Sequence, residues 1–192
     1  MKKITGIILA GGKSSRMGSD KGLLDLEGKK FINHIIDAIV PVVDELIIVA
    51  NNSNYNDLGY KVVGDLVKGC GPMGGIYTGL MISETEKNLI VSCDIPDIST
   101  ATLQTIISQS GKEDVTVPLH NEISEPLCAV YHKTCTTEFK KCLDRKEFKM
   151  RDALENLNVK YVHFGFNDFF SADDFANINT LGELETRKQK MK

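Results

Sequence analysis

A glycine-rich loop that carries two cations directly follows the first apolar run of the chain, residues 4–10. The loop supplies three glycines and two cations, which are Gly11, Gly12, Gly18, Arg16 and Lys21. Glycines let backbone N–H groups approach phosphate oxygens closely, and arginine and lysine neutralise the phosphate charge. A buried strand that ends in such a loop is typical of phosphate-binding sites. The sequence therefore predicts a site for a small phosphorylated ligand.

A single aspartate stands at the end of another apolar run. Asp94 ends the run that begins at residue 88, and Ile95 and Pro96 stop the predicted strand there. A carboxylate in this position is unfavourable unless it is paired or binds a metal. Mg²⁺ is commonly held by one or two carboxylates together with substrate phosphates. Asp94 is therefore the candidate ligand of a Mg²⁺ cofactor, and the alternative is a helix or turn cap.

The segments that must position these residues alternate between strand-like and helix-like patterns. Apolar runs predict strands at residues 4–10, 45–50, 88–93, 114–118, 127–132 and 159–164. Helical spacing of apolar residues predicts helices at residues 31–40, 76–82 and 103–107. This alternation indicates a single α/β domain over residues 1–192, Rossmann-like, with a mostly parallel sheet and helices on both faces. A capping box formed by Thr180 and Glu183 predicts a last helix that ends in a solvated basic tail, residues 187–192.

The polar segments of interest all follow predicted strands or short apolar stretches. Besides the glycine-rich loop and Asp94, these segments include Asn51 and Asn52 after the second strand, and Asp65 after residues 63–64. Ligands of open α/β sheets bind beyond the carboxyl ends of the strands. We therefore expect these residues to form one site.

The composition of the chain argues against nucleic acid and membranes as partners. The chain has 192 residues, a formal net charge of −3 and a pI near 5.8, so it lacks the basic character of a general nucleic-acid binder. The apolar run at the N-terminus is too short for a signal peptide or a membrane span, so we expect a cytoplasmic protein without membrane contact. The five cysteines show no zinc spacing and are expected to be free thiols.

Residues 9–23 follow the pattern L-A-G-G-x-x-x-R-M-G-x-D-K-G-L, and Asp94 lies in a C-D-x-P segment. Both patterns resemble the molybdenum cofactor guanylyltransferases, the nucleotidyltransferases that attach GMP to molybdopterin. Further segments that resemble this family are G-P-x-x-G-I at 71–76, the middle segment 125–131 and N-x-N-T at 177–180. The similarity therefore extends over nearly the whole chain.

The resemblance implies a nucleotidyltransferase sheet and the transfer of GMP from GTP to molybdopterin, with release of pyrophosphate and formation of molybdopterin guanine dinucleotide. It implies catalytic roles for Arg16, Lys21 and Asp94, with Mg²⁺ on Asp94. It implies GTP contacts for Leu9, Ala10, Gly11, Gly12, Lys21, Asn52, Asp65, Gly71, Gly74 and Asp94. Asn177 and Asn179 are implied to face molybdopterin.

Two alternatives remain open from the sequence. One is a sister enzyme of the same fold that transfers a cytidylyl group to molybdopterin or a nucleotidyl group to a sugar phosphate. Gly12 favours the guanylyl form, because the cytidylyl relatives tend to carry L-A-A-G. The other is a non-catalytic GTP-binding protein that delivers the cofactor, and the set of Arg16, Lys21 and Asp94 argues against it. We expect a monomer, and a surface for transient contact with molybdoenzymes or cofactor-insertion proteins is compatible with catalysis.

Overall fold

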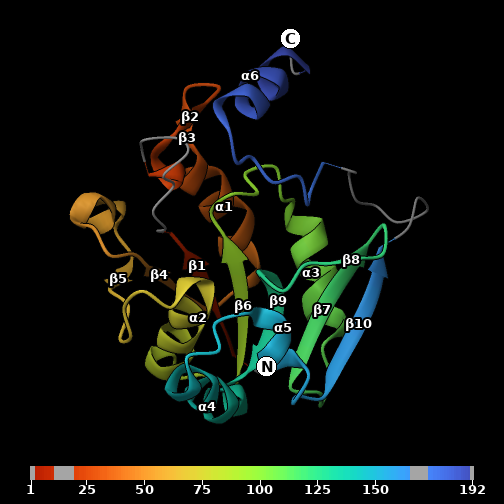
Figure 1. The fold of residues 1–192 in the computed structure, drawn as a ribbon. Coiled ribbons are helices and arrows are strands. Elements are labelled where there is room, and N and C mark those ends of the chain that lie inside the picture. The colour runs from red at the N-terminus through yellow and green to blue at the C-terminus, as the bar shows by residue number, and fades with distance from the viewer. Residues whose placement is uncertain (1–2, 11–19, 165–172, 191–192) are drawn as a thin grey trace.

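The chain folds as a three-layer α/β structure around one eight-stranded sheet (Figure 1). The structure is a computed structural model that describes residues 3–10, 20–164 and 173–190. The long strands are β1 (Ile4–Leu9), β4 (Glu45–Val49), β6 (Lys87–Ser92), β7 (Val115–His120), β9 (Cys128–His132) and β10 (Val159–Phe164). All six coincide with predicted strands. The short strands β5 (Lys61–Val63) and β8 (Ile123–Ser124), and the separate hairpin of β2 (Asp25–Leu26) with β3 (Lys29–Lys30), were not predicted.

The sheet is mostly parallel, as predicted. Its strand order is β10-β7-β9-β6-β1-β4-β5, and β8 pairs with β7 outside this path. Strand β1 lies between β4 and β6 and is parallel to both, whereas β9 is antiparallel to β6 and β7. The carboxyl ends of β1, β4, β5 and β6 therefore meet at one edge of the sheet.

Helices cover both faces of the sheet. On one face, α1 (Phe31–Ile39) and α3 (Thr100–Gln109) pack against β1, β4, β6 and β9, with Ile8 and Ile35 fully buried in this core. On the other face, α2 (Gly71–Ile82), α4 (Thr136–Arg145) and α5 (Met150–Leu154) pack against residues such as Ile7 and Ile90. The alternation of Ile7 and Ile8 follows from the two-residue period of a strand. Helices α4 and α5 were not predicted.

The last helix, α6 (Leu181–Lys190), lies beyond the carboxyl edge of the sheet and next to the β2–β3 hairpin (Figure 1). It begins at the predicted capping box: Glu183 N–H donates to the Thr180 hydroxyl at 3.2 Å, and Thr180 N–H donates to the Glu183 carboxylate at 3.0 Å. The prediction of a solvated basic tail is wrong for Arg187. Its guanidinium pairs with Asp97 and Asp173 and is only 19% exposed.

All five cysteines are free, as predicted, and all five are buried. Among the described helices, none is long and apolar enough to cross a membrane.

Candidate active site

The carboxyl edge of the sheet brings together the sequence-predicted residues that the structure describes. Leu9 is in register with Val49 of β4 and Ser92 of β6, so β1, β4 and β6 end side by side. The backbone continues this alignment, because Ala10 N–H donates to Val49 O at 2.9 Å and Cys93 N–H donates to Leu9 O at 3.1 Å. The segments that carry Asn52, Asp65 and Asp94 begin at this edge.

Lys21 lies between a carboxylate from the sheet and an amide from the C-terminal segment. Its ammonium nitrogen is 3.6 Å from Asp94 Oδ2, and the two side chains are 21% and 20% exposed. The same ammonium donates a hydrogen bond to Asn179 Oδ1. A backbone hydrogen bond holds Asn179 near Asp94, because Ile178 N–H donates to Asp94 O at 2.9 Å. Asp94, Lys21 and Asn179 come from three distant parts of the chain and meet at one partly exposed point.

Asp20 anchors Lys21, and sequence reasoning missed this role. The Asp20 carboxylate accepts hydrogen bonds from Gly22 N–H at 3.2 Å, from the Tyr55 hydroxyl at 2.5 Å and from the Asn52 side-chain amide. Tyr55 is fully buried, and burial together with the bond to Asp20 raises its pKa well above the ordinary value. Two signals were available: Asp20 is the aspartate of the pattern over residues 9–23, and it could cap the short helical turn Lys21–Leu23.

Asn52 is fixed by these contacts. Besides donating to Asp20, it accepts a hydrogen bond from Asn54 N–H at 3.0 Å through its side-chain oxygen. The structure thus places Asn52 at the predicted edge, with both ends of its amide bonded to the protein.

Asp65 is held by Asn51, which follows the adjacent strand β4. Asn51 donates to Asp65 Oδ2 at 2.7 Å, and Asp65 N–H donates back to Asn51 Oδ1 at 3.0 Å. Gly71 follows on the exposed start of α2 with a φ of +60°, and nothing lies within 4 Å of the position that a Cβ would take. Gly74 is buried, and a Cβ there would lie 2.8 Å from Val67 O, so this glycine permits the loop to pack on α2.

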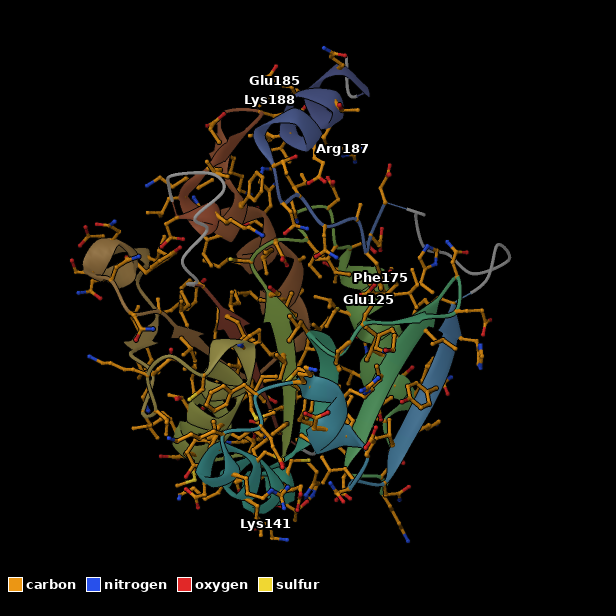
Figure 2. All side chains as sticks on the ribbon, viewed as in Figure 1. Glu125, Lys141, Phe175, Glu185, Arg187 and Lys188 are labelled. Atoms are coloured by element: carbon orange, nitrogen blue, oxygen red, sulfur yellow. The ribbon has the colours of Figure 1, made fainter. Side chains whose placement is uncertain are left out.

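A second carboxylate, Glu125, lies near Asp94 and was not predicted as a site residue. Burial raises its pKa to about 7, and the negative charge of Asp94 adds to this shift. Figure 2 shows Glu125 beside Phe175, on the part of the edge beyond β9. In the sequence, Glu125 was indicated only as part of the middle segment 125–131, which resembles the family.

Four residues of the predicted phosphate-binding loop, Gly11, Gly12, Arg16 and Gly18, lie outside the described residues. Asn177 is exposed, two residues before Asn179. Among the described residues there is no cluster of three or more His, Cys, Asp or Glu side chains that could hold a metal by themselves.

The mostly parallel sheet, with a lysine and a carboxylate at its carboxyl edge, places the chain in the class of open α/β proteins that bind ligands beyond the ends of their strands. The family model described as "MobA-like NTP transferase domain" matches residues 6–160, and the chain belongs to that family.

Relatives of similar length support this family. A Flavobacterium johnsoniae protein named probable molybdenum cofactor guanylyltransferase is 41% identical over 185 residues, covering 96% of each chain. The molybdenum cofactor guanylyltransferase of Yersinia pestis strain Pestoides F is 35% identical, covering 97% of this chain and 96% of its own.

A solved structure has the same fold. Molybdopterin-guanine dinucleotide biosynthesis protein A from Archaeoglobus fulgidus is similar with a TM-score of 0.83 at 24% identity, covering 97% of this chain and 98% of that chain. The expected nucleotidyltransferase fold is thereby confirmed.

Proposed function

We propose that this protein transfers GMP from GTP to molybdopterin, releasing pyrophosphate and forming molybdopterin guanine dinucleotide. The observation that carries the proposal is the meeting of Lys21, Asp94 and Asn179 at the carboxyl edge of the sheet. The full-length relatives named molybdenum cofactor guanylyltransferase support the choice of substrates.

The nucleotide lies, in this proposal, along the ends of β1, β4 and β5. Leu9, Ala10, Gly11 and Gly12 face its phosphates, and Asp65 and Gly71 face the nucleoside. Asn52 and Gly74 act indirectly, because Asn52 bonds to Asp20 and Gly74 packs on Val67. Asn177 and Asn179 face molybdopterin, since amide side chains can both donate to and accept from a pterin edge.

A divalent cation fits the residues at the end of β6. Asp94 offers a charged and partly exposed oxygen ligand, and Mg²⁺ is often bound by one carboxylate together with substrate phosphates. Mg²⁺ held by Asp94 would neutralise charge on the phosphate oxygens. Phosphate oxygens of the nucleotide and water would supply the remaining ligands.

The reaction requires no covalent intermediate with the protein. An oxygen of the terminal phosphate of molybdopterin forms a bond to the α-phosphorus of GTP, and the bond from that phosphorus to the bridging oxygen of the β-phosphate breaks. Lys21 and Arg16 stabilise the negative charge that develops on pyrophosphate. Positioning and charge neutralisation supply most of the rate enhancement in such transfers.

The experiment is a turnover assay with GTP, Mg²⁺ and molybdopterin in which pyrophosphate and the dinucleotide product are both measured. We expect one pyrophosphate for each dinucleotide formed. Turnover with CTP but not with GTP would support the sister cytidylyl activity instead. Binding of GTP without any product would support the delivery protein.

A further inference from the structure

One hydrogen bond joins the two proposed substrate sites. The Lys21 ammonium, which is proposed to bind the nucleotide, donates to Oδ1 of Asn179, which is proposed to face molybdopterin. The bond occupies one of the three N–H donors of the ammonium and one acceptor position of the amide oxygen, and a phosphate or a pterin edge bound at this point would use them instead. The bond therefore competes with both substrates.

The backbone around Asn179 is held in place from both sides. Asn179 N–H donates to the Glu183 carboxylate at 2.6 Å, and this bond holds the pKa of Glu183 below its ordinary value. Ile178 N–H donates to Asp94 O, as described above. Ile178 and Leu184 are buried with Leu26 and Phe31 in a small core that is separate from the two cores of the sheet.

Arg187 attaches α6 to the loop that follows Asp94. Its Nε lies 2.7 Å from Asp97 Oδ2, and the side chains are 19% and 11% exposed. Its Nη1 lies 3.1 Å from Asp173 Oδ2. Figure 2 shows Arg187 on a different side of α6 from Glu185 and Lys188. These ion pairs fix α6, and α6 carries Glu183, whose carboxylate accepts a hydrogen bond from the backbone N–H of Asn179.

We propose that this arrangement couples the two substrate sites, with Arg187 as a positioning residue that acts through Asn179 on Lys21. The proposal rests on the proposed function for the identity of the two substrates. It assigns to α6 a role in binding, in addition to its role in the fold.

The sign of the coupling follows from the shared bond. The first substrate to bind must break the bond between Lys21 and Asn179, and the second substrate finds it already broken. Each substrate therefore raises the affinity for the other by the same factor. Removing Asn179 should strengthen the binding of the nucleotide alone, because no bond remains to be broken. A residue that only stabilises the fold would not produce this gain.

The test is a calorimetric titration of the full chain with Mg²⁺ and the α,β-methylene analogue of GTP, which cannot be cleaved at the reacting bond. Each titration is done with and without saturating molybdopterin. For the wild type we expect molybdopterin to tighten analogue binding about tenfold, as for the loss of one charged hydrogen bond.

Three variants separate the steps of the argument. Asn179→Ala should bind the analogue alone several-fold more tightly than the wild type and show a coupling factor near one. Arg187→Ala should also lose the coupling. Lys188→Ala, on the same helix, is the matched control and should keep the wild-type coupling within about twofold. Thermal unfolding of each variant verifies that it is folded. If Arg187→Ala is unfolded, the result for Asn179→Ala decides the test.

Coupling in Asn179→Ala equal to that of the wild type would overturn the proposal, as would the absence of coupling in the wild type while both substrates bind. Failure of the proposed function has a different signature. In that case the wild type fails to bind the analogue or molybdopterin at all, whatever the variants do.

Discussion

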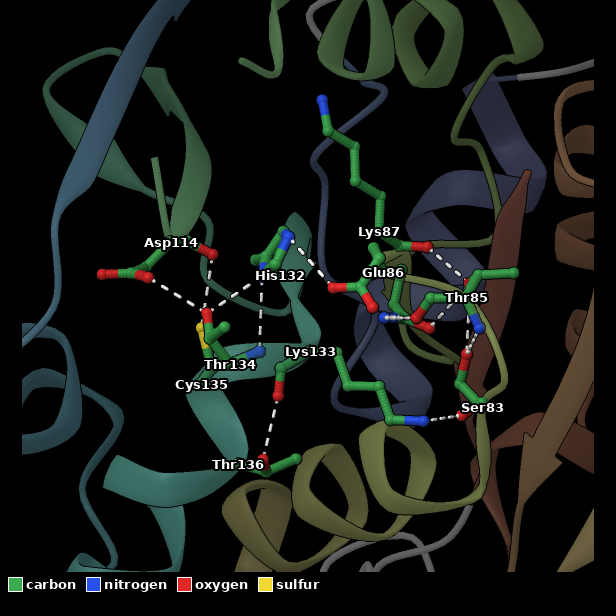
Figure 3. Close-up of polar contacts among 11 residues, drawn as sticks. Ser83, Thr85, Glu86, Lys87, Asp114, His132, Lys133, Thr134, Cys135 and Thr136 are labelled. Carbon is green, nitrogen blue, oxygen red and sulfur yellow. Dashed lines mark hydrogen bonds and ion pairs between the residues drawn. The ribbon is translucent and has the colours of Figure 1, made fainter. Parts of the chain in front are cut away.

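At the edge where the parallel strands begin, buried polar side chains bond mainly to one another, whereas at the edge where they end a lysine and a carboxylate stay partly exposed. At the first edge, the Thr85 hydroxyl donates to Thr5 Oγ1 at 2.9 Å and accepts a hydrogen bond from Thr5 N–H at 3.1 Å. Lys133 donates to Ser83 O beside it (Figure 3). Thr5, Thr85 and Ser83 are almost completely buried.

The polar groups at the carboxyl edge are arranged differently. Asp20, Asn51 and Asn52 bond to neighbouring protein groups, and in this way hold the loops. Lys21 and Asp94 keep about a fifth of their side chains exposed. A dense polar network therefore does not by itself mark a site. Charged groups that a network positions but does not enclose are a better guide.

The largest effect should come from removing the exposed charges. Lys21→Ala and Asp94→Ala should each lower turnover at least about 10³-fold, because each removes charge stabilisation at the phosphates. The free energy of unfolding should change by about 1 kcal/mol or less, since the pair is partly exposed. Lys141→Ala on α4, far from this edge in Figure 2, is the control and should keep full turnover. Turnover retained by either site variant would contradict the assignment.

The next effect should come from the anchor of Lys21. Asp20→Asn replaces a carboxylate that accepts three hydrogen bonds, so Lys21 should lose its position. We expect kcat/KM to fall about 10- to 100-fold, and the free energy of unfolding by about 2 kcal/mol. Tyr55→Phe removes one of the three donors and should have a smaller effect on both. Equal kcat/KM in Asp20→Asn and wild type would show that the anchor is dispensable.

The opposite edge should show stability effects without catalytic effects. Thr85→Val keeps the shape of the side chain but leaves its buried partners unbonded, which should cost about 2 kcal/mol of unfolding free energy. Turnover should stay within about twofold of the wild type. The exposed Thr105→Val on α3 is the matched control for stability. A large loss of turnover in folded Thr85→Val would break the distinction between the two edges.

The smallest effect concerns the titration of Glu125. Its pKa is about 7 in the folded protein against an ordinary 4.5, so the folded state binds the proton more tightly. The stability that Glu125 contributes is therefore fully present below pH 4.5 and is lost as the pH rises to about 7. The free energy of unfolding, measured with denaturant in the presence of EDTA, should therefore decline less over this pH range in Glu125→Gln than in the wild type. The exposed Glu84→Gln should behave as the wild type, and an unchanged decline in Glu125→Gln would contradict the pKa.

The central strands and the edge that carries the site were predictable because buried parallel strands leave continuous apolar runs. Strand β5 has three residues and β2 and β3 have two each, which is too short for a pattern. The direction of β9 leaves no signal in its composition. The helical spacing of Phe139, Cys142 and Leu143 would have predicted α4.

Contacts between distant segments could not be predicted. Arg187 meets Asp97 across 90 residues, and nothing near either residue indicates this pair. Likewise, the donors to Asp20 include Asn52 and Tyr55, which are placed only by the folded sheet. The sequence therefore predicted Lys21 and Asp94 as charged groups of the site, but not the residues that hold them.

The most direct test is a calorimetric titration of the wild type and Lys21→Ala with GTP, CTP, ATP and UTP in the presence of Mg²⁺. We predict selective binding of GTP by the wild type and loss of at least tenfold in GTP affinity in Lys21→Ala, as for a charged hydrogen bond to phosphate. A preference for CTP, or equal GTP affinity in the two proteins, would contradict a guanylyl site at the carboxyl edge.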